Sequence, residues 1–129
     1  MSELEILTEF KTQLINFFDE LITQFSQEGD LVVMRIFITN QMSIEMTIDK
    51  FIIELNKNNQ EFRTAIKNRD ELFFLEYKLK KDTQEKFNLA NFRKLWRSER
   101  LDNDDKNIIW DWFDTFLFLT DKYIKLKSA

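Results

Sequence analysis

The chain has 129 residues, a formal net charge of −4 and a hydrophobic fraction of 43%, enough apolar material to build a buried core and to exclude a disordered chain. It contains neither cysteine nor histidine, so disulfides, thiolate chemistry, imidazole-dependent triads and histidine-ligated metal sites are excluded. One glycine and no proline leave little of the turn chemistry of sandwiches and barrels, and we expect a single all-α domain over residues 1–129, a compact bundle of five or six helices.

The first predicted helix opens close to the N-terminus. Ser2 and Glu5 form a capping-box pattern, in which each side chain bonds the backbone of the other residue. Apolar residues then recur at spacings of three and four from Leu7 to Phe25, as on one face of a helix. The only glycine, Gly29, predicts the end of this helix, because a C-cap in the left-handed conformation favours glycine.

Residues 31–38, LVVMRIFI, form a nearly unbroken apolar run that is rich in β-branched side chains. Local propensity permits a buried strand here, but the chain offers no second strand to pair with it. We therefore expect a short buried helix that is broken at residues 39–41. Ser43 is expected to cap the next helix, whose apolar face comprises Ile44, Ile48, Phe51, Ile52 and Leu55.

A polar turn is predicted at residues 56–59, with Asn59 as the cap of the segment that follows. Residues 60–77 have a helical apolar pattern. The sequence leaves open whether this segment is one helix or two helices that are separated near residues 68–70.

Residues 78–100 hold eight basic and three acidic side chains, a local excess of positive charge in a chain that is acidic overall. Residues 78–86 predict an exposed loop, and a short helix is expected from about Asn88, with Phe92 and Trp96 facing the core. The opposite face then carries four basic side chains: Arg93, Lys94, Arg97 and Arg100. This face is either an ordinary solvated surface, a docking site for an acidic protein, or a nucleic-acid contact that combines phosphate pairing with base stacking. An overall pI near 5.0 weighs against a dedicated nucleic-acid-binding protein.

Residues 101–126 form the densest apolar and aromatic block, and they predict a long C-terminal helix at the centre of the bundle. Asp102 supplies an N-cap acceptor, while Asp104 and Asp105 suit the positive end of the helix dipole. Phe118 falls in the middle of the one polar strip of this helix. It is either covered by a loop or terminus, singly exposed, or a contact point for a partner. The apolar stripe comprises Ile109, Trp112, Phe113, Phe116, Leu119 or Thr120, and Tyr123.

No pattern indicates catalysis, a cofactor or a metal. The acidic run that begins at Asp102 resembles a calcium loop, but Asn107 and Phe113 stand where an EF-hand needs glycine and a bidentate glutamate. A chain with one glycine cannot build the common phosphate-binding loops. Most carboxylates are expected to lie on solvated helix faces. We therefore expect a protein that is not an enzyme, with no catalytic, cofactor-binding or metal-ligating residues.

The N-terminal residues MSELEILTEF have no basic region of the kind that opens a secretory signal. Apolar runs are far shorter than the roughly 18 residues that span a bilayer. We expect a soluble intracellular protein with no membrane contact.

Residues 95–123, LWRSERLDNDDKNIIWDWFDTFLFLTDKY, and residues 7–21, LTEFKTQLINFFDEL, resemble small all-helical proteins encoded by large nucleocytoplasmic DNA viruses of algae and protists. The most particular part of the resemblance is a basic Leu-Trp segment, then Leu-Asp, then Trp-x-Trp-Phe-Asp. It implies a viral setting, in the host cytoplasm or the virion, but no activity and no site residues.

The sequence thus favours a non-catalytic protein-interaction or structural module that docks a partner through Phe118 or through the basic face. The abundance of aromatic side chains also favours self-association into a homodimer. A nucleic-acid-associated factor that uses residues 78–100 is the alternative.

Overall fold

The computed structural model describes residues 1–76 and 101–128 of the chain, and this part contains six α-helices and no strand, which confirms the predicted all-α fold. The helices are α1 (Glu3–Gln24), α2 (Gly29–Gln41), α3 (Ile44–Asn56), α4 (Glu61–Asn68), α5 (Glu71–Glu76) and α7 (Asn103–Lys127).

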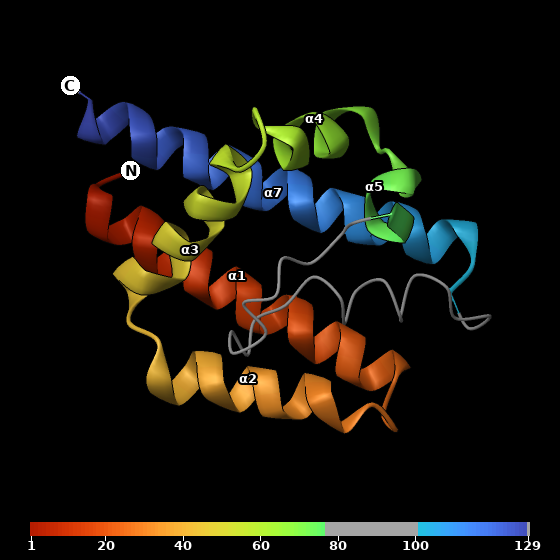
Figure 1. The fold of residues 1–129 in the computed structure, drawn as a ribbon. Coiled ribbons are helices and arrows are strands. Elements are labelled where there is room, and N and C mark those ends of the chain that lie inside the picture. The colour runs from red at the N-terminus through yellow and green to blue at the C-terminus, as the bar shows by residue number, and fades with distance from the viewer. Residues whose placement is uncertain (77–100, 129) are drawn as a thin grey trace.

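The two longest helices, α1 and α7, lie side by side and antiparallel, with α2 on the other side of α1 (Figure 1). Lys127 Nζ lies 3.1 Å from Glu3 Oε1, so an ion pair joins the end of α7 to the start of α1, and the hydrogen bond and charge of Glu3 raise the pKa of Lys127. The helix α3 packs on α1, and α4 packs on both α3 and α7. The C-terminal helix therefore has the central position expected of it, but it shares that position with α1, which packs against α2, α3 and α7.

Aromatic side chains from five helices, α1, α3, α4, α5 and α7, meet in the core. The ring centroids of Phe10 and Phe116 are 5.4 Å apart, and Phe17 meets Phe113 edge to face at 5.9 Å. Such offset and tilted arrangements favour contact between the positive edge of one ring and the negative face of another. The largest fully buried side chains are Phe10, Phe17, Phe18, Phe25, Phe116, Ile6, Ile38, Ile48, Leu55, Ile66 and Thr120.

Capping boxes start both long helices, as local sequence predicts. At α1, Ser2 Oγ accepts from the backbone N–H of Glu5, and Glu5 Oε1 accepts from the N–H of Ser2. At α7, Asp102 Oδ1 accepts from the N–H of Asp105 at 2.8 Å, and Asp105 Oδ2 accepts in return from the N–H of Asp102. Each box satisfies backbone donors that the first turn of a helix leaves without partners.

The predicted role of Gly29 as the C-cap of the first helix is wrong. The helix α1 ends at Gln24, and Gly29 is the first residue of α2, with no positive φ. Phe25 takes the C-cap position, where its N–H donates to the carbonyl of Leu21 at 2.7 Å and its side chain is buried. The helix α1 thus ends at the buried side chain of Phe25, and its C-cap is not a left-handed residue.

The apolar run at residues 31–38 lies in a helix, as expected, but two details of the prediction are wrong. The helix α2 continues through residues 39–41 to Gln41, and only one side of it is buried. Leu31, Met34 and Ile38 face α1 and the core, because they recur at helical spacing. The predicted cap of α3 is confirmed, since Ser43 Oγ accepts from the N–H of Met46.

The turn between α3 and α4 contains three consecutive left-handed residues, Asn58, Asn59 and Gln60, with φ of 52°, 58° and 63°. Gln60, and not Asn59 as predicted, occupies the N-cap position of α4, and no side chain caps this helix. The question left open for residues 60–77 is answered by Arg69, whose left-handed φ of 48° separates α4 from α5.

Candidate interaction surfaces

Phe118 lies on the outward side of α7 and 58% of its surface is exposed. The ammonium of Lys122, one helical turn further along α7, lies 4.6 Å from the centroid of the Phe118 ring and makes a cation–π contact with it. The two residues that flank it in sequence, Leu117 and Leu119, are buried. Phe118 is therefore neither part of the core nor covered.

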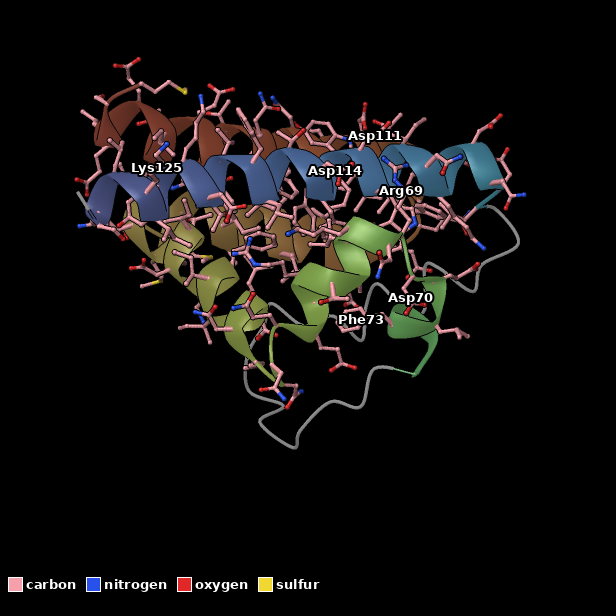
Figure 2. The ribbon with its side chains drawn as sticks, turned by 90° about the horizontal axis from the view of Figure 1, so that it is seen from above. Arg69, Asp70, Phe73, Asp111, Asp114 and Lys125 are labelled. Carbon is pink, nitrogen blue, oxygen red and sulfur yellow. The ribbon has the colours of Figure 1, made fainter. Side chains whose placement is uncertain are left out.

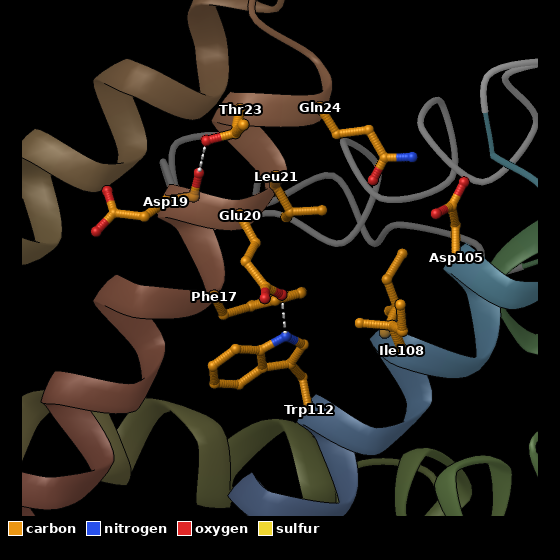
Figure 3. Close-up of a pocket in the computed structure, with 10 residues that line it drawn as sticks. Phe17, Asp19, Glu20, Leu21, Thr23, Gln24, Asp105, Ile108 and Trp112 are labelled. Carbon is orange, nitrogen blue, oxygen red and sulfur yellow. Dashed lines mark hydrogen bonds between the residues drawn. The ribbon is translucent and has the colours of Figure 1, made fainter.

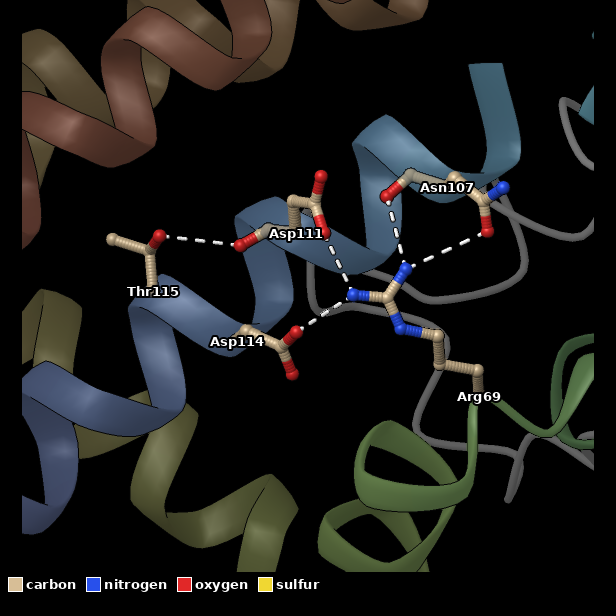
Figure 4. A network of polar contacts seen from close by, with 5 residues as sticks. All are labelled: Arg69, Asn107, Asp111, Asp114 and Thr115. Atoms are coloured by element: carbon tan, nitrogen blue, oxygen red, sulfur yellow. Dashed lines mark hydrogen bonds and ion pairs between the residues drawn. The ribbon is translucent and has the colours of Figure 1, made fainter. Parts of the chain in front are cut away.

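Three aspartates of α7 form ion pairs with arginines from α4 and its C-cap. Arg69 Nη2 lies 2.6 Å from Asp111 Oδ1 and 2.9 Å from Asp114 Oδ2, and Arg69 Nη1 reaches Asn107 (Figure 4). The hydrogen bond to Asp111, assisted by Asp114, raises the pKa of Arg69. Figure 2 looks onto α7 and shows Arg69 reaching towards Asp111 and Asp114.

A second ion pair extends this contact along α7, because Arg63 Nη1 lies 2.7 Å from Asp121 Oδ1. These pairs are at least partly exposed, so each contributes little to stability by itself. Together they fix the register of α4 against α7.

The outward side of α2 is apolar. Val33 and Ile36 are 57% and 52% exposed, and Val32 beside them is also exposed. No charged side chain lies among Val32, Val33, Ile36 and Asn40, which share this side at helical spacing. We call these four residues the α2 face. Sequence reasoning missed this face, although the lack of a polar side in the run at residues 31–38 was its signal.

Two side chains of α1 form polar contacts with α2 and hold it against the bundle. Arg35 Nε pairs with Asp19 Oδ1, and Lys11 Nζ donates to the carbonyl oxygens of Thr39 and Met42. The second contact satisfies acceptors at the C-terminal end of α2, where the helix dipole is negative. The edge helix is therefore fixed by polar contacts as well as by its buried side.

A pocket of about 410 Å³ opens between the C-terminal half of α1 and the first turns of α7 (Figure 3). Trp112 Nε1–H donates to Glu20 Oε2 across it at 2.6 Å. The lining residues are Phe17, Asp19, Glu20, Leu21, Thr23, Gln24, Asp105, Ile108, Ile109 and Trp112. Within the described part of the chain this lining has three carboxylates and no basic side chain, and we call it the acidic pocket. Nothing in the sequence brings Glu20 and Trp112 together, because they are 92 positions apart.

The four predicted basic contact residues, Arg93, Lys94, Arg97 and Arg100, lie outside the described residues, as do the predicted loop at 78–86 and the short helix after it. Within residues 1–76 and 101–128, no group of three or more His, Cys, Asp or Glu residues is arranged to hold a metal ion. In the same two ranges no helix has the length and apolar character that crossing a membrane requires.

Comparison with known proteins identifies no relative of this chain: no family model, no curated protein and no solved structure matches it. The surfaces of the molecule therefore supply the evidence for its function.

Proposed function

We propose that this protein is a non-catalytic protein-interaction module that binds a helix of a partner protein on the α2 face. The observation that carries the proposal is the exposure of Val33 and Ile36 side by side on a helix whose other side is buried. A helix that is apolar on all sides is normally enclosed, so an uncovered apolar side favours a partner.

The chemistry of the α2 face also supports a helical partner. Branched side chains of α2 form ridges at helical spacing, and such ridges pack into the grooves of a second helix. Covering apolar side chains of this size stabilises a complex by about 25 cal/mol for each Å² removed from water. Because the face has no charge, the partner is expected to present an apolar stripe and not a charged one.

Phe118 supplies a second contact point in this proposal. It lies on α7, and Figure 1 shows α7 and α2 on opposite sides of α1, so one partner segment cannot cover both surfaces by lying along α2 alone. A homodimer formed through the α2 face is one form of the proposal, in which a second copy supplies the partner helix.

Site-specific photo-crosslinking tests the α2 face. A benzophenone side chain at position 36 is compared with the same group at Thr12, an exposed residue on the polar side of α1. We expect position 36 to give a discrete product, mapped by mass spectrometry to an apolar helix of one protein or of a second copy, while position 12 gives none. Absence of that product, or the same products at both positions, would contradict the proposal.

Matched substitutions complete this test. Val33→Ser with Ile36→Ser should abolish the crosslink made from a benzophenone at Val32, whereas Ile53→Ser, an exposed residue on α3, should leave it unchanged. Sedimentation velocity on the unmodified protein over a hundredfold concentration range separates the homodimer from a different partner, since only self-association depends on the concentration of this chain.

The alternative function is nucleic-acid binding through residues 78–100, and the local excess of basic side chains favours it. Binding to a mixed-sequence duplex should then weaken steeply as salt rises, because counterions are released on binding. Arg93→Glu with Arg97→Glu should abolish it. Binding that is indifferent to salt, or unaffected by this pair of substitutions, would contradict the alternative.

The resemblance to small helical proteins of large DNA viruses supports a viral setting for this module, inside the host cell or in the particle. Quantitative proteomics of purified particles and of infected cells tests it. Failure to find the protein in either sample would contradict this setting without bearing on the α2 face.

A further inference from the structure

We infer that the acidic pocket between α1 and α7 binds an alkylammonium group, such as the side chain of a lysine in a partner polypeptide. The pocket includes neither the α2 face nor Phe118. A failure of amine binding would therefore not contradict the proposed function, and the reverse also holds. Three properties of the pocket carry the inference: its charge, its apolar floor and the way its carboxylates are held.

Two of the three carboxylates in the pocket form no ion pair with another described residue. Asp19 forms an ion pair with Arg35, but Glu20 accepts a hydrogen bond from the neutral indole of Trp112, and Asp105 accepts from the backbone N–H of Asp102. Neutral donors orient a carboxylate without cancelling its charge. Since the described lining residues include no basic side chain, Glu20 and Asp105 favour a cation from outside.

The floor of the pocket is apolar and is preformed by the core. Phe17 and Leu21 are buried, and Ile108 lies beside them on α7 with 49% of its surface exposed. Trp112 is fixed by stacking on Phe116, with ring centroids 6.1 Å apart and planes 28° apart. Such a floor suits the methylene chain of an alkylammonium group, and the indole adds a cation–π surface for its charged end.

The arrangement does not suit a bare metal ion. A divalent cation needs several oxygen ligands at about 2.0–2.6 Å from one point. The carboxylates of this pocket line it without converging on such a point, and no metal-holding group of acidic residues occurs in the described residues. Acidic residues spread around an apolar floor select an organic cation. A volume of about 410 Å³ is also at the scale of small-molecule and side-chain pockets.

The pocket is tested by NMR titration of the full-length protein, with the Trp112 indole N–H signal as reporter, assigned through Trp112→Phe. The probes are Nα-acetyl-lysine methylamide, spermidine and Nα-acetyl-norleucine methylamide, which has the lysine stem without the ammonium. We expect both amines to move the signal in a saturable way and the norleucine derivative not to move it. A shift by the lysine derivative identifies a peptide source, and a shift by spermidine alone identifies a free polyamine.

Two substitutions sharpen the result. Glu20→Gln should weaken amine binding at least about tenfold, because a charged hydrogen-bond acceptor is lost. Ile108→Lys should abolish it by placing an ammonium of the chain in the pocket. Its control is Ile53→Lys, at a similarly exposed isoleucine of α3 outside the pocket, which should leave binding unchanged.

The inference is overturned if neither amine moves the Trp112 signal, or if the norleucine derivative moves it equally. It is also overturned if Glu20→Gln and Ile108→Lys bind the amines as the unmodified protein does. Both positions are exposed and outside the core, so the variants are expected to fold, and their circular dichroism spectra check this.

Discussion

Lys11 Nζ donates a hydrogen bond of 2.6 Å to the backbone oxygen of Met42, which lies 31 positions further along the chain. The contact places a cation of α1 at the negative end of the α2 dipole and satisfies a carbonyl that no backbone amide reaches within the helix. It therefore adds a polar link between two adjacent helices, beside the buried side chain of Met42.

Lys11→Met tests the strength of this link, because methionine keeps most of the apolar stem and removes the charge. We expect the free energy of unfolding to fall by about 1 kcal/mol, the scale of a cation at the end of a helix dipole. Lys122→Met, at an exposed position of α7 before its last turn, is the control and should change stability by less than about 0.5 kcal/mol. Urea denaturation measures both. Equal effects would mean that the Met42 contact contributes nothing particular.

Arg69 gives a prediction about backbone strain. Its left-handed φ of 48° costs a non-glycine residue roughly 1 kcal/mol, while its partly exposed ion pairs to Asp111 and Asp114 repay part of that cost. Arg69→Ala should therefore be less stable than Arg69→Gly, the reverse of the usual order at a helical position. Thermal unfolding of both variants measures this order. If Arg69→Ala were the more stable, the left-handed conformation would not be the source of strain.

Glu5 gives a prediction about pH. Hydrogen bonds from Ser2 lower the pKa of Glu5 from its usual value of 4.5, so the carboxylate stabilises the folded chain above that pH. This contribution is lost as the pH falls through the lowered pKa, because the proton binds the unfolded state first. The difference in Tm between the unmodified protein and Glu5→Gln should thus be largest near neutral pH and shrink below about pH 4.5. In a Ser2→Ala background the difference should be smaller at every pH. A constant difference would contradict the capping box as its cause.

Phe118 and Phe116 provide a matched pair two positions apart on α7. Phe116→Ala should cost about 3–5 kcal/mol, because it empties a site at the centre of the aromatic core. Phe118→Ala should change stability by less than about 0.5 kcal/mol, since its ring is exposed. Denaturant unfolding of the two variants checks both values. A large loss from Phe118→Ala would show that the residue supports the fold and is no free contact point.

The starts of α1, α3 and α7 were predictable from sequence because their signals are local. Ser2, Ser43 and Asp102 bond amides within three positions, so short patterns contain all the information. Helix ends were less predictable. Gly29 is compatible with a left-handed cap and with a first helical turn, and only the burial of Phe25 decides between them.

The surfaces were harder to predict because they depend on which side of a helix is not covered by another helix. The apolar run at residues 31–38 reads equally well as a helix enclosed on all sides and as a helix at the edge. Periodicity did identify Phe118 as out of place on its polar strip. The acidic pocket had no sequence signal at all, because its two hydrogen-bonded walls come from Glu20 in α1 and Trp112 in α7.

The pairing of α1 with α7 has a consequence for the order in which the fold forms. Phe10 and Phe17 find their aromatic partners in Phe113 and Phe116, about a hundred positions later. During synthesis on the ribosome, α1 therefore emerges with an apolar side whose final covering does not yet exist. Contacts of such long sequence separation slow folding, since the loop entropy is lost before the contacts form. Until α7 is made, α1 can pack against α2 and α3, and α3 against α4. This packing limits how much of the apolar side of α1 is exposed to aggregation during that interval.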